Sequence, residues 1–115
     1  MTDDRLKASF AHDIVLLKLV GMNPVVVHGG GREIDAGLAA AGIPKQQVDG
    51  LRVTDAPTLG VVVSVVAGAI NTRLVGAVRK AGGQPVGLTG ADAGVAVMRR
   101  AAPITSVAGD RVDLG

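Results

Sequence analysis

The sequence predicts an α/β protein with a parallel sheet between layers of helices, and two segments carry this prediction. Three valines, Val25–Val27, run into glycines and then into a helical pattern. A later apolar segment, Gln84–Gly90, also ends at a glycine. Strands of a parallel sheet are buried on both faces, so they form continuous apolar runs. Because two strands make a poorly covered sheet, we expect this sheet to be incomplete, with β-hairpins at its periphery.

Composition narrows the class of protein. The chain has 115 residues, no cysteine, 48% hydrophobic residues and a formal net charge of +2, and its one aromatic residue is Phe10. Scattered positive charge with a single aromatic residue does not indicate nucleic-acid binding. The absence of cysteine excludes disulfides and thiolate metal sites. We see no signal-peptide pattern and no apolar run of membrane-spanning length, and therefore expect a cytoplasmic protein of one small domain, or part of one, without membrane contact.

The first half of the chain predicts two helices and a hairpin. Apolar residues at helical spacing indicate a helix over residues 3–20, with Thr2 or Asp3 as its N-cap and Gly21 as its end. A second helix follows the glycines and ends at Gly42. The pair Asp49-Gly50 lies between short alternating runs, which indicates a hairpin turn.

The second half begins with a helix start, because Thr54-Asp55 followed by Pro57 is typical of a cap and a first turn. We expect two helices or one kinked helix, at about 56–67 and 69–80, although the valine runs leave a strand as the competing interpretation. The apolar breadth of this segment suggests burial on two sides, including at a subunit interface. Residues 95–100 are expected to form an edge strand, and Gly109-Asp110 the turn of a second hairpin.

The glycines Gly29, Gly30 and Gly31 are the first candidate site. A strand that passes through glycines into a helix leaves backbone N–H groups at a helix N-terminus, which attracts anions. A tight turn without a ligand is the alternative interpretation. The run is neither the G-x-G-x-x-G pattern nor a Walker A loop, so a dinucleotide-binding domain is a weaker third interpretation. Arg52, which the hairpin should carry outward beside this loop, could clamp a carboxylate, or it could simply face solvent.

Three motifs carry a resemblance to a known family. They are VVVHGGGREI at 25–34, GLRVTD at 50–55, and VGLTG at 86–90 followed by Asp92. In this order and spacing they resemble the acetylglutamate kinases of the amino-acid kinase family, over essentially the whole chain. The resemblance implies the three-layer α-β-α fold of that family.

The resemblance also implies an activity. ATP with Mg²⁺ would donate its γ-phosphoryl group to the side-chain carboxylate of N-acetyl-L-glutamate, in the second step of arginine biosynthesis. Gly30 and Gly31 would meet the carboxylate and the phosphoryl group, Gly29 would be a further contact, and Arg52 would hold a substrate carboxylate. The family also implies a homo-oligomer.

The departures from the family are equally informative. Its K-x-G-G strand and its C-terminal half, which supply two charge-stabilising lysines, a substrate-binding asparagine and most of the ATP site, have no counterpart in these 115 residues. We therefore expect residues 1–115 to be a partial N-terminal, acetylglutamate-binding domain that lacks the first strand, the ATP-binding domain and the catalytic residues. Arg32 stands where many members have proline. The chain alone should be inactive. The alternative is a stand-alone module that binds acetylglutamate or pairs with a kinase.

Overall fold

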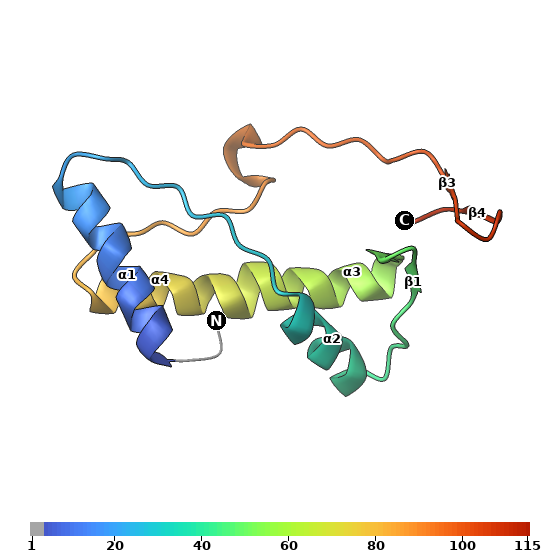
Figure 1. The fold of residues 1–115 in the computed structure, drawn as a ribbon, viewed down its shortest axis with the longest axis horizontal. Helices are drawn as coiled ribbons and strands as arrows, with labels where there is room; N and C mark the ends of the chain where they lie inside the picture. The colour runs from blue at the N-terminus through green and yellow to red at the C-terminus, as the bar shows by residue number, and fades with distance from the viewer. Residues whose placement is uncertain (1–3) are drawn as a thin grey trace.

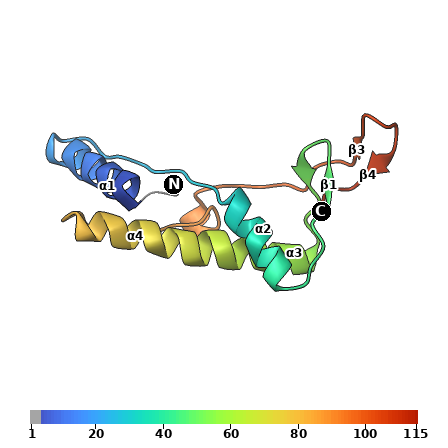
Figure 2. The same ribbon diagram turned by 60° about the horizontal axis from the view of Figure 1, so that its bottom comes forward.

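The computed structural model describes residues 4–115, and its main feature is one long helix with the other elements around it (Figure 1). The long helix is continuous through three segments: α3, Ala56–Val63; a π-helical segment, Ser64–Ile70; and α4, Asn71–Lys80. Helix α1, Asp4–Leu19, packs on α4, and α2, Gly31–Ala40, packs on α3 and the π-helical segment. Figure 2 shows α1 and α2 at separate places along the long helix.

The ends of the helices follow the sequence prediction. Gly21, Gly42 and Gly82 have φ of +93°, +67° and +95°, the left-handed conformation that ends a helix after its last turn. The N-cap of α3 is Asp55, whose Oδ1 accepts a hydrogen bond of 2.9 Å from the backbone N–H of Thr58. The expected cap of α1 at Thr2 or Asp3 lies outside the described residues.

The valine-rich segment is helical, so the competing strand interpretation is wrong, and of the two helical alternatives the structure has the single helix rather than two. In place of a break, the helix changes to π geometry over Ser64–Ile70 and then continues. A π-helical turn has i→i+5 hydrogen bonds and is rare within α-helices.

The uninterrupted helix also corrects the expectation that the chain has no apolar run long enough to span a membrane. Ala56–Lys80 has 25 residues, and its most apolar 18-residue window has a mean hydropathy of 1.8 with 11% of that window buried. By length and composition it could cross a membrane. One such helix is weak support for a membrane protein, since the core helix of a soluble protein passes the same test.

The two expected central strands do not form in the described part of the chain. Residues 25–28 and 84–90 run extended along one side of the long helix without a strand ladder (Figures 1 and 2), and Val25, Val27 and Val86 are 88%, 91% and 81% exposed. The reason is physical: a strand exists only with a partner for its backbone groups. The edge strand expected at 95–100 is absent for the same reason.

Both predicted hairpins form, each as a separate two-stranded antiparallel sheet. Strands β1, Gln47–Val48, and β2, Leu51–Arg52, pair Gln47 with Arg52. Strands β3, Ile104–Thr105, and β4, Arg111–Val112, pair Ile104 with Val112. Within residues 4–115 these small sheets do not show a three-layer parallel sheet, although helices with peripheral hairpins fit an α/β protein.

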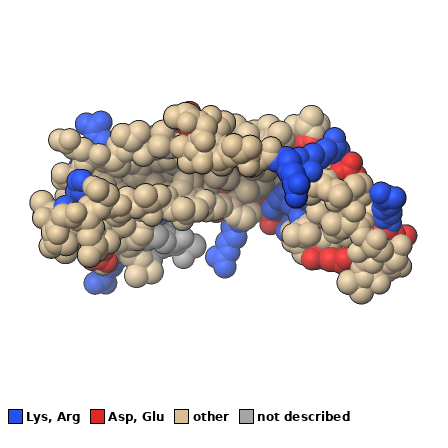
Figure 3. Space-filling model, turned by 90° about the horizontal axis from the view of Figure 1, so that it is seen from above, with Lys and Arg blue, Asp and Glu red and all other residues tan. Residues whose placement is uncertain are grey.

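The buried core is small. Its apolar members among the described residues are Ala11, Ile34, Leu38, Ile70 and Val78. The radius of gyration is 17.1 Å, against about 13 Å for a compact domain of this length. Figure 3 shows broad uncharged surface between the two ends of the molecule, with Lys, Arg, Asp and Glu at both ends and more of them at the end that carries α2 and the hairpins. Large apolar side chains such as Val25, Val27 and Val97 are more than four-fifths exposed, so much apolar surface is available for further packing.

Candidate functional site

The glycine run joins the extended segment 25–28 to the N-terminus of α2. Gly30 is the N-cap, with φ −169° and ψ 42°, and Gly31 is the first helical residue. Gly30 has no side chain to accept a hydrogen bond, so the first-turn N–H groups of α2 have no side-chain cap. The Gly30 carbonyl accepts the first helical bond, from the N–H of Ile34 at 2.8 Å. The loop therefore presents backbone donors at the positive end of a helix dipole.

The three glycines differ in what surrounds them. A Cβ on Gly30 would collide with the Cδ1 of Ile70, in the π-helical segment, and would lie 3.7 Å from Val66 Cγ2. Beside Gly29 and Gly31 a Cβ would meet nothing within 4 Å. Neither of these two has the positive φ that favours glycine.

Packing therefore explains glycine at position 30 only. Gly29 and Gly31 face open space, where a Cβ would keep a ligand away from the backbone N–H groups. The packing at Gly30 agrees with the alternative of a tight turn without a ligand.

Arg52 does not point outward, as the hairpin alone suggested. The turn forms as predicted, with Asp49 at φ +50° and Gly50 at +81°. The Arg52 side chain is only 16% exposed, and its Nη2 donates to Asp35 Oδ1 on α2 at 2.6 Å. Its Nη1 is buried without a hydrogen-bond partner in the part of the chain that the structure describes.

Asp35 joins a second cation to this pair. Its Oδ2 accepts from Lys45 Nζ at 2.8 Å. These hydrogen bonds, first from Lys45 and then from Arg52, lower the pKa of Asp35 below its ordinary value, so it is a carboxylate at neutral pH. Sequence reasoning missed Asp35 and Lys45. No sequence signal pairs Asp35 with Lys45, which lies 10 positions away, or with Arg52, which lies 17 positions away.

The residues of the third motif form a local turn. Asp92 Oδ2 accepts from the backbone N–H of Thr89 at 2.6 Å and from its hydroxyl at 2.8 Å. These bonds, the backbone one first, lower the pKa of Asp92. The turn continues into a short 3₁₀ segment, Asp92–Gly94. Asp92 therefore has a structural partner in Thr89.

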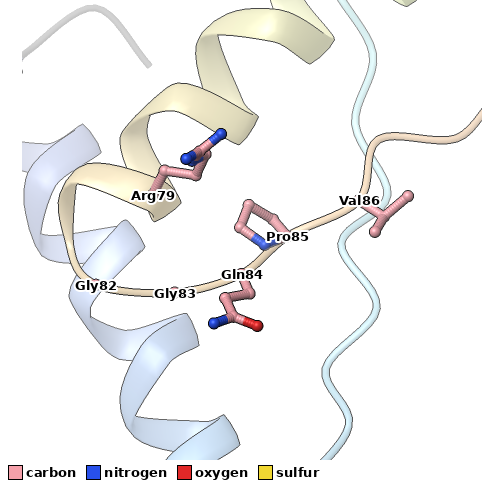
Figure 4. A pocket seen from close by; sticks show the side chains of 6 residues that line it. All are labelled: Arg79, Gly82, Gly83, Gln84, Pro85 and Val86. Atoms are coloured by element: carbon pink, nitrogen blue, oxygen red, sulfur yellow. The ribbon is translucent and has the colours of Figure 1, made fainter.

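A shallow hollow lies elsewhere, where α4 ends (Figure 4). Its volume is about 590 Å³, and it is lined by Arg79 and residues 82–86. Its lining contains neither the glycines of the loop nor Arg52. No group of three or more metal-ligating side chains occurs within residues 4–115.

Comparison with known proteins assigns a family to this arrangement. The pattern of the amino acid kinase family matches residues 1–112. The acetylglutamate kinase of Azoarcus sp. is 49% identical over 117 residues, which cover all of this chain and 39% of that protein. That of Delftia acidovorans is 53% identical over 100 residues (87% of this chain, 34% of the relative), and that of Chromobacterium violaceum 56% over 92 (80% and 32%).

The chain thus spans about a third of the length of these curated relatives. The match includes the glycine loop, the hairpin with Arg52 and the turn at Asp92, the three motifs that suggested the family from the sequence. Because the family pattern covers nearly every residue, the chain belongs to the amino acid kinase family.

Proposed function

We propose that this chain is the acetylglutamate-binding part of an acetylglutamate kinase, in which ATP phosphorylates the side-chain carboxylate of N-acetyl-L-glutamate in the cytoplasmic synthesis of arginine. The observation that carries the proposal is the open space beside Gly29 and Gly31 at the N-terminus of α2, within a sequence about half identical to proteins named acetylglutamate kinase. The names of these relatives support the reaction, and the geometry of the glycine loop supports an anion site.

In this proposal the chain positions the substrate and supplies positive charge from backbone N–H groups and Arg52. Phosphoryl transfer requires stabilisation of charge on the transferring group and alignment of the acceptor, more than covalent help from the protein. The backbone N–H groups at Gly29–Gly31 would contact the acceptor carboxylate and the phosphoryl oxygens. Arg52 would bind the substrate's other carboxylate, because a guanidinium forms strong hydrogen bonds with that group.

The described residues do not fit a dedicated metal site, since they contain no cluster of metal-ligating side chains. Mg²⁺ would therefore arrive as the complex with ATP, bound mainly through the phosphates. No step of the chemistry is assigned to this chain's own carboxylates.

A protein made of these 115 residues alone should bind substrate without transferring phosphate, because the lysines expected from the family are not among them. Loss of a charge-stabilising cation costs about 10³–10⁵ in rate in the arginine-finger case. A single turnover of ATP to ADP that depends on N-acetyl-L-glutamate, with the pure chain, would contradict this expectation. The second candidate is a binding module that pairs with a complete kinase, and co-purification with such a kinase would favour it.

The exposed apolar segments support a homo-oligomer. Val25, Val27 and Val86 are each more than four-fifths exposed on unpaired extended backbone, and such segments associate with other chains. Sedimentation at about 10–50 μM, within the range where exposed apolar surface drives association, should show species larger than the monomer. A single monomeric species would remove this part of the proposal.

Thermal unfolding with and without N-acetyl-L-glutamate tests the binding function. A ligand that binds only the native state adds about 2.7 kcal/mol at 100 times its Kd. N-acetyl-L-glutamine, which lacks the side-chain carboxylate, is the matched control. A cooperative transition that rises with the first compound and not with the second supports the function. No shift with either compound would refute it.

A further inference from the structure

The hairpins β1–β2 and β3–β4 belong to separate ladders, yet hydrogen bonds join them to each other. The backbone N–H of Val107, in the turn between β3 and β4, donates to Asp49 Oδ2 at 2.9 Å. The backbone N–H of Thr54, after β2, donates to the carbonyl of Leu114, after β4, at 2.7 Å. The hairpins therefore lie side by side in the same orientation, turn beside turn and end beside end, near the start of α3 (Figures 1 and 2).

Asp49 has two roles in this arrangement. Its φ of +50° is the left-handed conformation that the turn with Gly50 requires, and asparagine, aspartate and glycine all suit such a turn. The bond to Val107 adds a second requirement, a side chain with a hydrogen-bond acceptor, which glycine lacks. The turn of the second hairpin is closed by bonds between Ser106 and Asp110, so Asp49 supplies the acceptor for the Val107 N–H from outside that turn.

Arg52 lies on the first hairpin between these two connections. Its Nη2 donates to Asp35 Oδ1 at 2.6 Å, so hairpin β1–β2 is fixed both to α2 and to β3–β4. The segment that leads to the second hairpin, residues 95–103, contains no helix or strand and is exposed throughout. The second hairpin therefore takes its position mainly from the first.

We propose that the two hairpins form one conformational unit, joined by Asp49, that shifts on α2 as a single body. The consequence for ligands rests on the proposed function. The Arg52 side chain is only 16% exposed and its Nη1 is buried, so a ligand carboxylate reaches this guanidinium only after β1–β2 has moved relative to α2. The unit makes β3–β4 part of that movement, although residues 104–112 lie outside the three family motifs.

Distances between pairs of spin labels test whether the hairpins move together. The chain has no cysteine, so labels can be attached after Gln47→Cys on β1, Arg111→Cys on β4 and Ala39→Cys on α2, which are exposed positions. Asp35→Ala in this background removes the partner of Arg52 on α2 and releases the first hairpin from the helix.

The two interpretations differ in which distances change. If the hairpins form one unit, Asp35→Ala broadens the distances from positions 47 and 111 to position 39 and leaves the distance between 47 and 111 narrow. If the hairpins are independent, the distance from 111 to 39 stays as it was and the distance between 47 and 111 broadens, which would overturn the proposal. No change in any of the three distances would also overturn it, because the unit would then not shift on α2.

Asp49→Gly tests the side chain that joins the hairpins. A Gly-Gly turn keeps the positive φ that the first hairpin needs, while the acceptor for Val107 is lost. We expect the distance between positions 47 and 111 to broaden and the Thr54 amide, at the other end of the hairpins, to exchange about fivefold faster or more, the lower end for coupled sites. Asp49→Asn keeps the turn and a side-chain oxygen, so it is the matched control and should change neither. A Thr54 amide that stays protected in Asp49→Gly would refute the role of Asp49.

N-acetyl-L-glutamate separates this inference from the proposed function. In the labelled chain without further substitution, saturating ligand should shift the distances from positions 47 and 111 to position 39 together. A shift at position 47 alone, or no shift in a chain that binds the ligand, would overturn the proposal. If the chain binds no ligand, the proposed function fails, and the distances in Asp35→Ala and Asp49→Gly still decide whether the hairpins form one unit.

Discussion

Replacing Gly31 with alanine separates the fold of the glycine loop from its proposed function. Gly31 is the first residue of α2 and does not have a positive φ, and a Cβ there would meet no atom within 4 Å. Alanine is more favourable than glycine in a helix by about 0.5–1 kcal/mol. We therefore expect Gly31→Ala to leave stability unchanged or to raise it by up to about 1 kcal/mol, a Tm increase of about 4–8 °C for a small domain.

Binding should change in the opposite direction. If the carboxylate or phosphoryl group approaches the backbone at Gly31, the new methyl group prevents that approach. Loss of one hydrogen bond to a charged group costs about 1.5–3 kcal/mol, or a rise in Kd of roughly 10–150-fold at 1.4 kcal/mol per factor of ten. Urea unfolding and calorimetric titration with N-acetyl-L-glutamate on the same sample give both quantities.

Gly30→Ala is the contrasting variant. Its Cβ would collide with Ile70 Cδ1, and Ile70 is only 7% exposed, so the δ-methyl group has to move within the core. Overpacking of this kind costs about 1–3 kcal/mol, and we expect the lower half, because the group displaced is the end of a side chain. The reasoning is refuted if Gly31→Ala binds as well as the unsubstituted chain, or if Gly30→Ala is as stable as that chain.

Three further outcomes follow from the described contacts. Asp55→Ala should lower the unfolding free energy by about 1 kcal/mol, since it removes the cap of α3, and urea unfolding measures this loss. Folding lowers the pKa of three carboxyl groups, those of Asp35, Asp55 and Asp92. Their contribution to the stability of the fold should therefore be complete above the ordinary value of 3.8 and be lost as pH falls through the lower folded values. A urea midpoint that did not fall between pH 5 and pH 2 would contradict this. Asp92→Ala should lower the hydrogen-exchange protection of the Thr89 amide, whose acceptor it removes, while Asp110→Ala, in the turn between β3 and β4, should not.

The elements that could be predicted from the sequence are those with local causes. The glycines that end α1, α2 and α4 have the required left-handed φ, and the Asp49-Gly50 turn formed because both residues adopt positive φ. The strands expected at 25–28 and 84–90 could not be predicted in this way. Their apolar pattern is typical of buried strands, but burial and backbone pairing have to come from other segments. The π-helical segment was also not predicted, because its residues have no local signature in the sequence.

In the candidate site, too, the sequence predicted the features with local causes and missed those that depend on distant residues. The sequence pointed to Gly29–Gly31 and Arg52, since glycine and arginine have restricted chemical uses in such a pattern. It did not distinguish Gly30, whose need for glycine comes from Ile70, forty residues away in the sequence. Nor could it indicate the contact between Asp35 and Arg52, which exists only when β2 lies against α2.

The π-helical segment limits how the length of the long helix can change. Helix α2 packs on the helix upstream of and within Ser64–Ile70, and α1 packs downstream on α4. Each residue of an α-helix turns the chain by about 100°, so the residues in the segment set the angle between the two packing surfaces. Deleting one of them would turn the surface that receives α1 away from the side that holds the glycine loop. We therefore expect the number of residues here to be constrained more tightly than their identities.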